Sequence, residues 1–357
     1  MLLRLRALPG MASWGLRFLR ECHEPRWRAN TRATFALARA SLVALDRLAA
    51  DQDLQFDRNR PGLIKLFRDR LSMDSAVRAS HLYQELGYPL RTLDPPGCVA
   101  EEPALAPIRE RVAGGILYPN DESGDAYGFV QALAQLCETR GVIFRPAVSV
   151  NGFDCDGMIR SVASSAGRID GDAFVLAAGA QSVGLARKLG LTLPIYPAKG
   201  YSLTVRHRCW SQAPRRPIVD DGRKAALTPL GDRIRVAGTV EFAGWDTSLN
   251  PTRGRMLDQA LHDVLPELPQ TTEPPVHWAG LRPLTPDGRP ILGRSSIPNL
   301  YLNIGHGPLG WTLACGSGLA LAELISGGRP SVDLAPYRWP RSAKSSAGPS
   351  AGHRSGR

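Results

Sequence analysis

The chain has 357 residues and 43% of them are hydrophobic, so it can bury a large core and is long enough for two or three domains. Its net charge is +11, but 39 of the 44 basic residues are arginine, and no zinc-finger, RNP or helix-turn-helix signature accompanies them. We therefore expect no nucleic-acid partner, while a weak attraction to an anionic membrane face stays open. No run of eighteen apolar residues is present, which argues against a membrane-spanning helix.

Metal sites and disulfides are not indicated. The six cysteines and seven histidines show neither C-x-x-C nor H-E-x-x-H spacing. Asp121, Glu122 and Asp125 could form a metal cluster, but Asp125 is better placed as the N-cap of a helix that begins at Ala126. We predict no bound metal and expect reduced thiols, as in a cytoplasmic protein.

The opening third, residues 1–117, is predicted to be mainly helical. Its first forty residues hold eight arginines and two acids, a composition similar to a transit peptide. Apolar residues at helical spacing over 28–48 favour a helix packed on a domain instead. A strand over 62–67 and a helix over 75–86 follow, so we expect this part to be the cap of a substrate domain.

From residue 118 to 190 the pattern alternates between helices and apolar strands. We predict helices over 126–139 and 183–189, and strands over 142–144, near Val148, over 158–162 and over 173–177. Apolar strands that alternate with helices are typical of a buried, largely parallel sheet.

Residues 191–279 have a different pattern, with short strands of antiparallel type over 201–205, 224–227 and 233–237 and a helix over 253–264. Over 280–335 the β-α pattern returns, with a strand at 300–304 and a helix at 312–325. The pattern therefore predicts one α/β domain that is encoded in pieces around an antiparallel insertion. The remaining residues, 336–357, are expected to be a disordered tail.

The turn from Gly305 to Gly310 matches G-x-G-x-x-G between a strand and a helix, as in dinucleotide-binding proteins. That fingerprint requires a further strand with an acidic residue about 20 positions later. Because the chain reaches Gly327 and Gly328 instead, we reject the simple fingerprint. The glycines still allow close approach to a flat ligand, and the helix start favours one that gains negative charge, as reduced flavin does. The alternative is a tight turn without a ligand.

Four stretches of the chain form a recognisable set: residues 118–125 (YPNDESGD), 196–202 (YPAKGYS), 280–288 (GLRPLTPDG) and 303–317 (NIGHGPLGWTLACGS). In order and spacing they resemble the D-amino acid oxidase-like flavoproteins, in particular the bacterial dehydrogenases of this family. The likeness runs from about residue 14 to 327. It implies FAD as cofactor and a mixed α/β fold, in which a Rossmann-like FAD-binding domain carries an inserted antiparallel substrate domain. Segments 118–190 and 280–335 would bind FAD, and 191–279 would bind substrate.

The resemblance further implies oxidation of a D-amino acid to a 2-oxo acid and ammonia, with electrons passed to a quinone or respiratory carrier. The protein would be cytoplasmic, with peripheral association to the inner membrane. A relative that oxidises glycine, sarcosine or another amine with oxygen is the nearest alternative, and a non-catalytic remnant is another.

The front of the chain departs from the family pattern. Family members begin with a strand, a glycine turn and a helix that hold the FAD pyrophosphate, and no such unit is recognisable before residue 100. We expect that the start codon is assigned too late and that the FAD-binding domain is incomplete at its N-terminus. The chain as given is then expected to hold FAD poorly.

By resemblance, Arg282 binds the substrate carboxylate, although a structural salt bridge is the alternative. Tyr201 and Lys199 are predicted to face the substrate, with ordinary packing as the alternative. His306 is either a titrating group or a side chain packed in the turn. The residues predicted to contact FAD are Val148, Ala178, Gly179, Gly305, His306, Gly307, Leu309, Gly310, Trp311 and Thr312.

Overall fold

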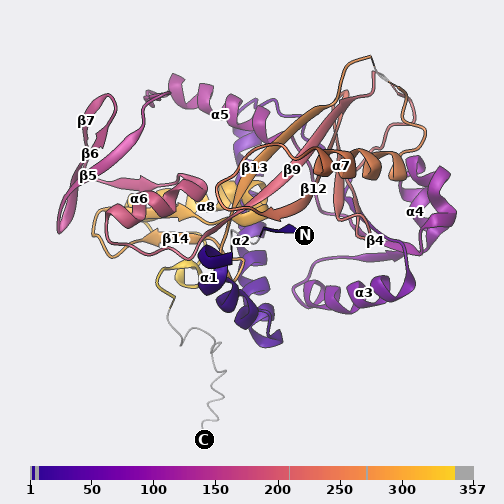
Figure 1. Cartoon of the computed structure of the whole chain (residues 1–357), viewed down its shortest axis with the longest axis horizontal. Coiled ribbons are helices and arrows are strands. Elements are labelled where there is room, and N and C mark those ends of the chain that lie inside the picture. The colour runs from indigo at the N-terminus through magenta and orange to yellow at the C-terminus, as the bar shows by residue number, and fades with distance from the viewer. Residues whose placement is uncertain (1, 5–7, 209, 271, 342–357) are drawn as a thin grey trace, which may run out of the picture. The chain divides into compact units, whose positions relative to one another are not determined.

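The computed structural model describes residues 2–4, 8–208, 210–270 and 272–341 (Figure 1). Contacts divide the chain into two units, each assembled from separated segments. The first unit consists of Met1–Ala7, Asp53–Ile143 and Ala198–Leu281, and the second of Leu8–Gln52, Phe144–Pro197 and Arg282–Arg357. The sequence pattern groups residues 1–117 together, whereas the structure assigns Leu8–Gln52 to the second unit because the helices there pack on its other segments.

A mixed sheet forms the frame of the first unit. Its strand order is β13-β9-β12-β11-β10-β2-β4-β3, and β1 pairs with β12. Strand β12 pairs antiparallel with both β9 and β11, which confirms the antiparallel pattern expected in this region. The strands are β1 (Leu2–Leu3), β2 (Leu63–Phe67), β3 (Arg91–Leu93), β4 (Gly114–Tyr118), β9 (Tyr196–Arg206), β10 (Ile218–Asp220), β11 (Ala225–Leu230), β12 (Arg233–Phe242) and β13 (Val276–Leu284).

Helices of the first unit begin at the side-chain caps that the sequence provides. Asp125 accepts hydrogen bonds from the backbone N–H groups of Tyr127 and Gly128, as predicted, and Asp69 caps the helix that begins at Arg70 in the same way through the N–H of Ser72. The core beneath the sheet is aliphatic and includes Leu203. The helices are α3 (Arg70–Glu85), α4 (Pro95–Glu101), η2 (Pro103–Arg111), α5 (Ala126–Thr139) and α7 (Pro251–Val264).

Two three-stranded sheets lie in the second unit. In the order β14-β15-β8, strand β15 pairs parallel with β8 and antiparallel with β14, and β8 ends the order. The other sheet, β5-β6-β7, is antiparallel throughout. The strands of these two three-stranded sheets are β5 (Val150–Asp156), β6 (Met158–Ser164), β7 (Gly167–Asp170), β8 (Phe174–Leu176), β14 (Ile291–Arg294) and β15 (Leu300–Ile304).

The strands predicted over 142–144 and near Val148 are wrong. Residues 142–149 form no strand, and the side chain of Ile143 is 78% exposed. An apolar run becomes a buried strand only when neighbouring strands pair with it, and no described strand pairs with this segment. The predicted strand at 158–162 exists as β6, but it lies in the antiparallel sheet.

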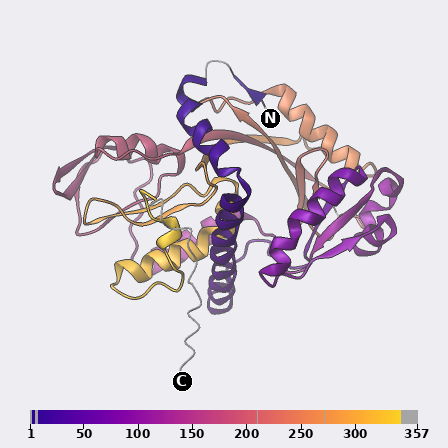
Figure 2. The same ribbon diagram turned by 90° about the horizontal axis from the view of Figure 1, so that it is seen from below.

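Helices α2 and α8 pack closely on each other in the second unit (Figure 2). A Cβ atom on Gly316 would lie 2.8 Å from the backbone nitrogen of Ser41, so glycine is required for this approach. Residues Gly307–Ile325 are long and apolar enough to cross a bilayer, but a core helix passes the same test, and this helix packs on α2, β14 and β15. The helices are α1 (Leu8–Glu21), α2 (Glu24–Asp51), η3 (Gly179–Gln181), α6 (Ser182–Lys188), η4 (Gly307–Leu309), α8 (Gly310–Ile325) and η5 (Ala335–Tyr337).

Part of the predicted disordered tail is packed. Tyr337 is 1% exposed and donates a hydrogen bond of 2.5 Å to the carbonyl of Ala33. Arg341 forms an ion pair with Asp287 at 2.7 Å. The prediction is therefore wrong for residues 336–341, while residues 342–357 lie outside the described residues.

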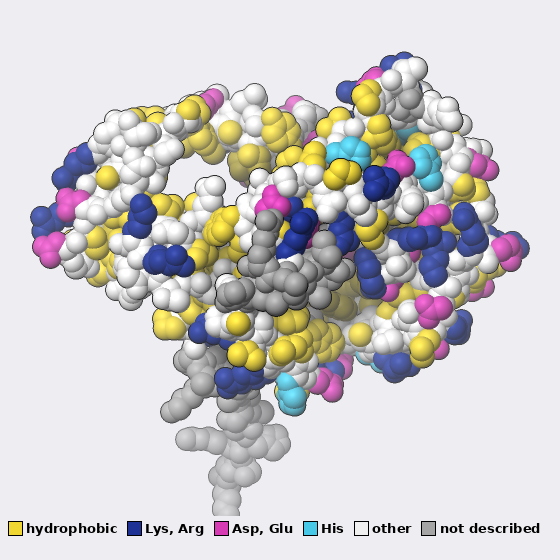
Figure 3. All heavy atoms as spheres, in the orientation of Figure 1, with side chains coloured by type: hydrophobic (Ala, Val, Ile, Leu, Met, Phe, Trp, Pro, Cys, Tyr) yellow, Lys and Arg dark blue, Asp and Glu magenta, His cyan; other side chains and the backbone are white. Residues whose placement is uncertain are grey.

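Basic side chains are interspersed with acidic ones over the face that Figure 3 shows. Many basic side chains form ion pairs, such as Arg58 with Glu122 at 2.9 Å and Lys65 with Asp221 at 2.8 Å. Much of the positive charge is thus locally compensated, even though the net charge is +11.

Candidate active site

The glycine turn that links β15 to α8 has a backbone that favours glycine. Gly305 and Gly307 have φ values of +78° and +55°, in the left-handed region that other residues rarely adopt. A Cβ atom on Gly305 would lie 2.8 Å from Cγ2 of Thr285, and one on Gly307 would lie 3.3 Å from Cδ2 of Leu284. The turn is therefore held closely against the end of β13.

Strand β13 brings Arg282 toward this turn. Leu284 forms an isolated antiparallel bridge with His306, and its carbonyl accepts a hydrogen bond of 2.9 Å from Trp14 Nε1. Because side chains alternate along a strand, Arg282 and Leu284 share one face of β13. Arg282 is half-buried, and this burial lowers the pKa of its guanidinium. Residues far apart in sequence, Trp14, Arg282 and His306, are thus connected within the second unit.

His306 is fixed inside the turn. Its Nε2 lies 3.0 Å from Oγ of Ser317, a residue of α8 that is 1% exposed. Burial lowers the pKa of His306 to about 4, so the imidazole is neutral near pH 7. A neutral imidazole hydrogen-bonded to a buried hydroxyl is suited to holding the turn in one conformation.

The carboxyl ends of β8 and β15 meet at one edge of their parallel pair. Leu176 is opposite Leu302, so the segment at Ala178 and Gly179 emerges at the same edge as the glycine turn. This is the edge at which α/β proteins bind ligands. Val148 lies in the irregular segment before β5, and its contact with FAD stays a prediction.

Two buried polar atoms near this edge have no hydrogen-bond partner among the described residues, Oδ1 of Asn303 and Oγ of Ser182. Such groups are costly unless a ligand or water pairs with them. In addition, no side chain caps the start of η4 or of α8, where Leu309, Gly310, Trp311 and Thr312 lie. The backbone at this helix start therefore favours a ligand that carries negative charge.

Lys199 and Tyr201 lie in the first unit, within a buried cluster around Glu241. Lys199 Nζ is 3.5 Å from Glu241 Oε2, 3.3 Å from Asp246 Oδ2 and 3.0 Å from the Ser248 carbonyl. Tyr201 donates a hydrogen bond to the Glu241 carboxylate. Lys199 and Glu241 are both 0% exposed.

The Glu241 cluster is electrostatically satisfied. Arg4 pairs with Glu241 at 2.5 Å. Burial alone would raise the pKa of Glu241, but the hydrogen bonds from Tyr201 and Arg4 and the Lys199 charge outweigh it, so the pKa is lowered. Burial would lower the pKa of Lys199, yet Tyr201, Asp246 and Glu241 together raise it. The ammonium is thus kept charged by the protein, and a role of Lys199 and Tyr201 toward substrate stays a prediction.

The carboxylates once considered as metal ligands have protein partners. Tyr88 donates a hydrogen bond of 2.5 Å to Asp121, and Glu122 pairs with Arg58. Among the described residues, no group of three or more His, Cys, Asp or Glu side chains could hold a metal ion.

Sequence reasoning missed several residues of these sites. Trp14 and Ser317 support the turn, and Glu241 connects Lys199 with Tyr201. Glu241 carried a usable signal, because an acid between Val240 and Phe242 in an apolar strand is expected to have a buried partner. Trp14 carried none, since its contact depends on residues 270 positions later.

The fold and the glycine turn together define a mixed α/β protein with a glycine-rich turn between a strand and a helix. A family model described as FAD dependent oxidoreductase matches residues 10–324, and the chain belongs to this family. The chain is 41% identical to the D-amino acid dehydrogenase of Bradyrhizobium diazoefficiens over 91% of its own length and 77% of the relative's. It is 43% identical to the D-amino acid dehydrogenase of Paramagnetospirillum magneticum, over 91% and 76%.

Solved structures agree with this assignment. Glycine oxidase from Geobacillus kaustophilus matches with a TM-score of 0.77 and 25% identity, covering 85% of this chain and 81% of that one. L-proline dehydrogenase from P. horikoshii matches with a TM-score of 0.76 at 20% identity, covering 88% and 84%, and supports the fold alone. The mixed α/β fold expected from the sequence is confirmed.

FAD fits the residues around the glycine turn. The left-handed glycines admit a flat ring system, the start of α8 is uncapped, and Asn303 and Ser182 leave buried polar atoms to be paired. These features occur together at the carboxyl edge of β8 and β15, where the family's cofactor would be held.

Proposed function

We propose that the protein oxidises D-amino acids to 2-oxo acids and ammonia in an FAD-dependent reaction. The observation that supports the proposal is that Arg282 lies two residues before Leu284 on β13, on the same face of the strand, and that Leu284 bridges to His306 of the glycine turn. The identity of 41% to a D-amino acid dehydrogenase over most of the chain supports this substrate class.

Arg282 is suited to bind the substrate carboxylate. A guanidinium offers a planar fork that matches a carboxylate bidentately, and partial burial strengthens the pair relative to water. Fixing the carboxylate determines which face of the α-carbon is presented, and so selects between D and L substrates. The bound FAD supplies the acceptor, at flavin N5, for the hydride that leaves the α-carbon.

The glycine turn supplies orientation and charge stabilisation. Backbone N–H groups at the start of α8 lie at the positive end of a helix of 16 residues, which stabilises negative charge developing on a ligand there. His306 and Ser317 hold the turn in place, and the neutral imidazole adds no competing positive charge near pH 7.

We further propose that the electrons pass to a quinone or respiratory carrier at the cytoplasmic face of a bacterial inner membrane. The matching relatives are named dehydrogenases, which supports an acceptor other than oxygen. The likeness to glycine oxidase supports the rival function, an oxidase that returns electrons to oxygen.

The test supplies excess FAD to the 357-residue chain. Reduction of a redox dye and release of peroxide are measured with D-alanine, L-alanine and glycine. We expect dye reduction with D-alanine, little peroxide, and a loss of at least about a hundredfold in kcat/KM for Arg282→Ala, equivalent to roughly 3 kcal/mol.

Arg282→Lys provides the matched control, because it keeps the positive charge but not the bidentate geometry. Its KM should lie between the KM of the parent and that of Arg282→Ala. Protein that holds FAD stoichiometrically and yet reduces no dye with any D-amino acid would refute the proposed function. Peroxide release equal to substrate consumption would establish the oxidase instead.

A further inference from the structure

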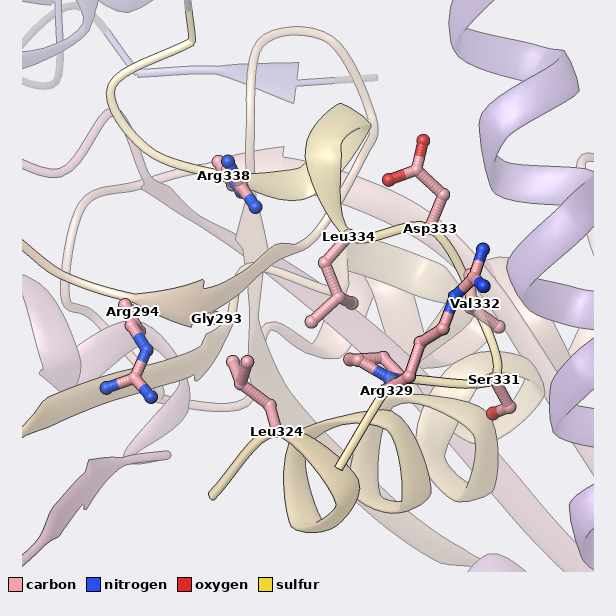
Figure 4. A pocket seen from close by; sticks show the side chains of 10 residues that line it. Gly293, Arg294, Leu324, Arg329, Ser331, Val332, Asp333, Leu334 and Arg338 are labelled. Atoms are coloured by element: carbon pink, nitrogen blue, oxygen red, sulfur yellow. The ribbon is translucent and has the colours of Figure 1, made fainter. Parts of the chain in front are cut away.

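A cavity of about 870 Å³ lies at the C-terminal end of α8, at the opposite end of that helix from the glycine turn. It is lined from three segments: the end of β14, the loop after α8, and the residues around η5. Its floor is apolar, with Leu324 and Leu334 pointing toward each other, and three exposed arginine side chains lie around them and point in different directions (Figure 4).

The three arginines are Arg294, Arg329 and Arg338, and none forms an ion pair with another described residue. Arg294 instead stacks its guanidinium over the ring of Tyr301 at 5.0 Å, which leaves its N–H edges available. This contrasts with the paired arginines elsewhere, such as Arg68 with Asp220 and Arg233 with Asp125.

Asp333 is the only acidic residue that lines the cavity among the described residues, and one of its carboxylate oxygens accepts the backbone N–H of Ala335. The lining therefore carries an excess of two positive charges from three arginines and one aspartate. Uncompensated guanidinium groups around an apolar floor are suited to an anion that carries an apolar body.

We propose that this cavity binds a phosphate ester, with the phosphate attracted to the exposed arginines around the cavity, Arg294, Arg329 and Arg338, and the apolar part placed against Leu324 and Leu334. Guanidinium forks match phosphate oxygens bidentately, and phosphate prefers several such donors at once. The site is separate from the glycine turn and does not depend on the proposed oxidation. The same chemistry is offered by a phospholipid headgroup at a membrane surface or by a soluble phosphate ester.

The test compares the parent with a variant that carries R294S, R329S and R338S. A matched control carries R17S, R20S and R39S, three exposed arginines on α1 and α2 that do not line the cavity. Both variants lower the net charge from +11 to +8, so non-specific attraction falls equally. Thermal unfolding of all three proteins shows whether the substitutions leave the fold intact.

Two probes separate the sources of phosphate. Sedimentation with phosphatidylglycerol or phosphatidylcholine vesicles measures binding to a headgroup, and calorimetry with glycerol 1-phosphate measures binding of a soluble ester. We expect one of these probes to bind the parent and to lose between about ten- and a hundredfold in affinity with the cavity variant, and less than about twofold with the control.

Loss for vesicles alone assigns the site to a lipid headgroup, and loss for glycerol 1-phosphate assigns it to a soluble ester. If neither probe binds the parent, or if both variants lose affinity equally, the proposal is overturned.

Discussion

Gly316 and Gly318 lie two residues apart on α8 and provide a matched pair of substitutions to alanine. A Cβ atom on Gly316 would lie 2.8 Å from the backbone nitrogen of Ser41, 2.9 Å from its Cα and 3.0 Å from the carbonyl oxygen of Leu37. All three atoms belong to the backbone of α2, so the helix itself must move. On Gly318 a Cβ atom would have nothing within 4 Å.

Two effects of opposite sign act on stability when alanine replaces glycine in this helix: the gain in helix propensity and the cost of overpacking. Alanine in place of glycine within a helix stabilises by up to about 1 kcal/mol, and this is the whole effect expected for Gly318→Ala. Overpacking costs roughly 1 to 3 kcal/mol, so Gly316→Ala should be neutral or destabilising by up to about 2 kcal/mol. The two variants should therefore differ by about 1 to 3 kcal/mol.

Urea unfolding without FAD, followed by far-ultraviolet circular dichroism, measures this difference at a common pH and ionic strength. The slope of free energy against urea should be equal in both variants, so that the midpoints compare directly. If Gly316→Ala is as stable as Gly318→Ala, then α2 and α8 do not approach as closely as the structure has them.

Three further predictions concern the Glu241 cluster and the glycine turn. Glu241→Gln should lower the free energy of unfolding by about 3 to 5 kcal/mol at pH 7, because Lys199 loses a buried charged partner. The folded protein lowers the pKa of Glu241 below its ordinary value of 4.5, so this loss should become smaller as the pH falls below 4.5. An equal loss in urea unfolding at pH 7 and pH 4 would contradict this prediction. The pKa of His306 is near 6.5 in the unfolded chain and about 4 in the folded protein, so protonation favours the unfolded state. The free energy of unfolding should therefore fall by roughly 3 kcal/mol as the pH is lowered from 6.5 to 4. His306→Asn should abolish this dependence of the free energy of unfolding on pH. Gly307→Ala should destabilise by about 1 to 2 kcal/mol in thermal unfolding and weaken FAD binding in flavin titration. Gly310→Ala, at a φ of −53°, should not lower the thermal midpoint, and equal destabilisation by the two variants would remove the left-handed turn from the argument.

Sequence patterns predicted the elements whose signals are local. The helix at α5 begins where Asp125 caps it, and the strand β15, the glycine turn and α8 follow the order read from residues 300–325. These features depend on capping, periodicity and glycine conformations, which act over a few residues. The predicted helix over 28–48 is likewise present within α2.

Features that depend on distant partners could not be predicted in the same way. The run Val142 to Phe144 has strand composition but no described partner strand, so it stays irregular and exposed. The neighbours of Lys199 come from β12 and from residues 246–248, and nothing local indicates that Glu241 would meet Tyr201. The hydrogen bond from Tyr337 to Ala33 joins parts of the chain 304 positions apart. The composition of the C-terminal residues is typical of a disordered tail and gives no sign of this contact.

The position of β8 at the end of its sheet bears on how the protein behaves in concentrated solution. Among the described strands only β15 pairs with β8, and Val175 within β8 is 47% exposed. An uncovered strand edge is a template for pairing with another molecule through backbone hydrogen bonds, which salt screens only weakly. Self-association that grows with concentration and persists at high ionic strength is therefore the expected colloidal behaviour, and a lysine at position 175 should suppress it.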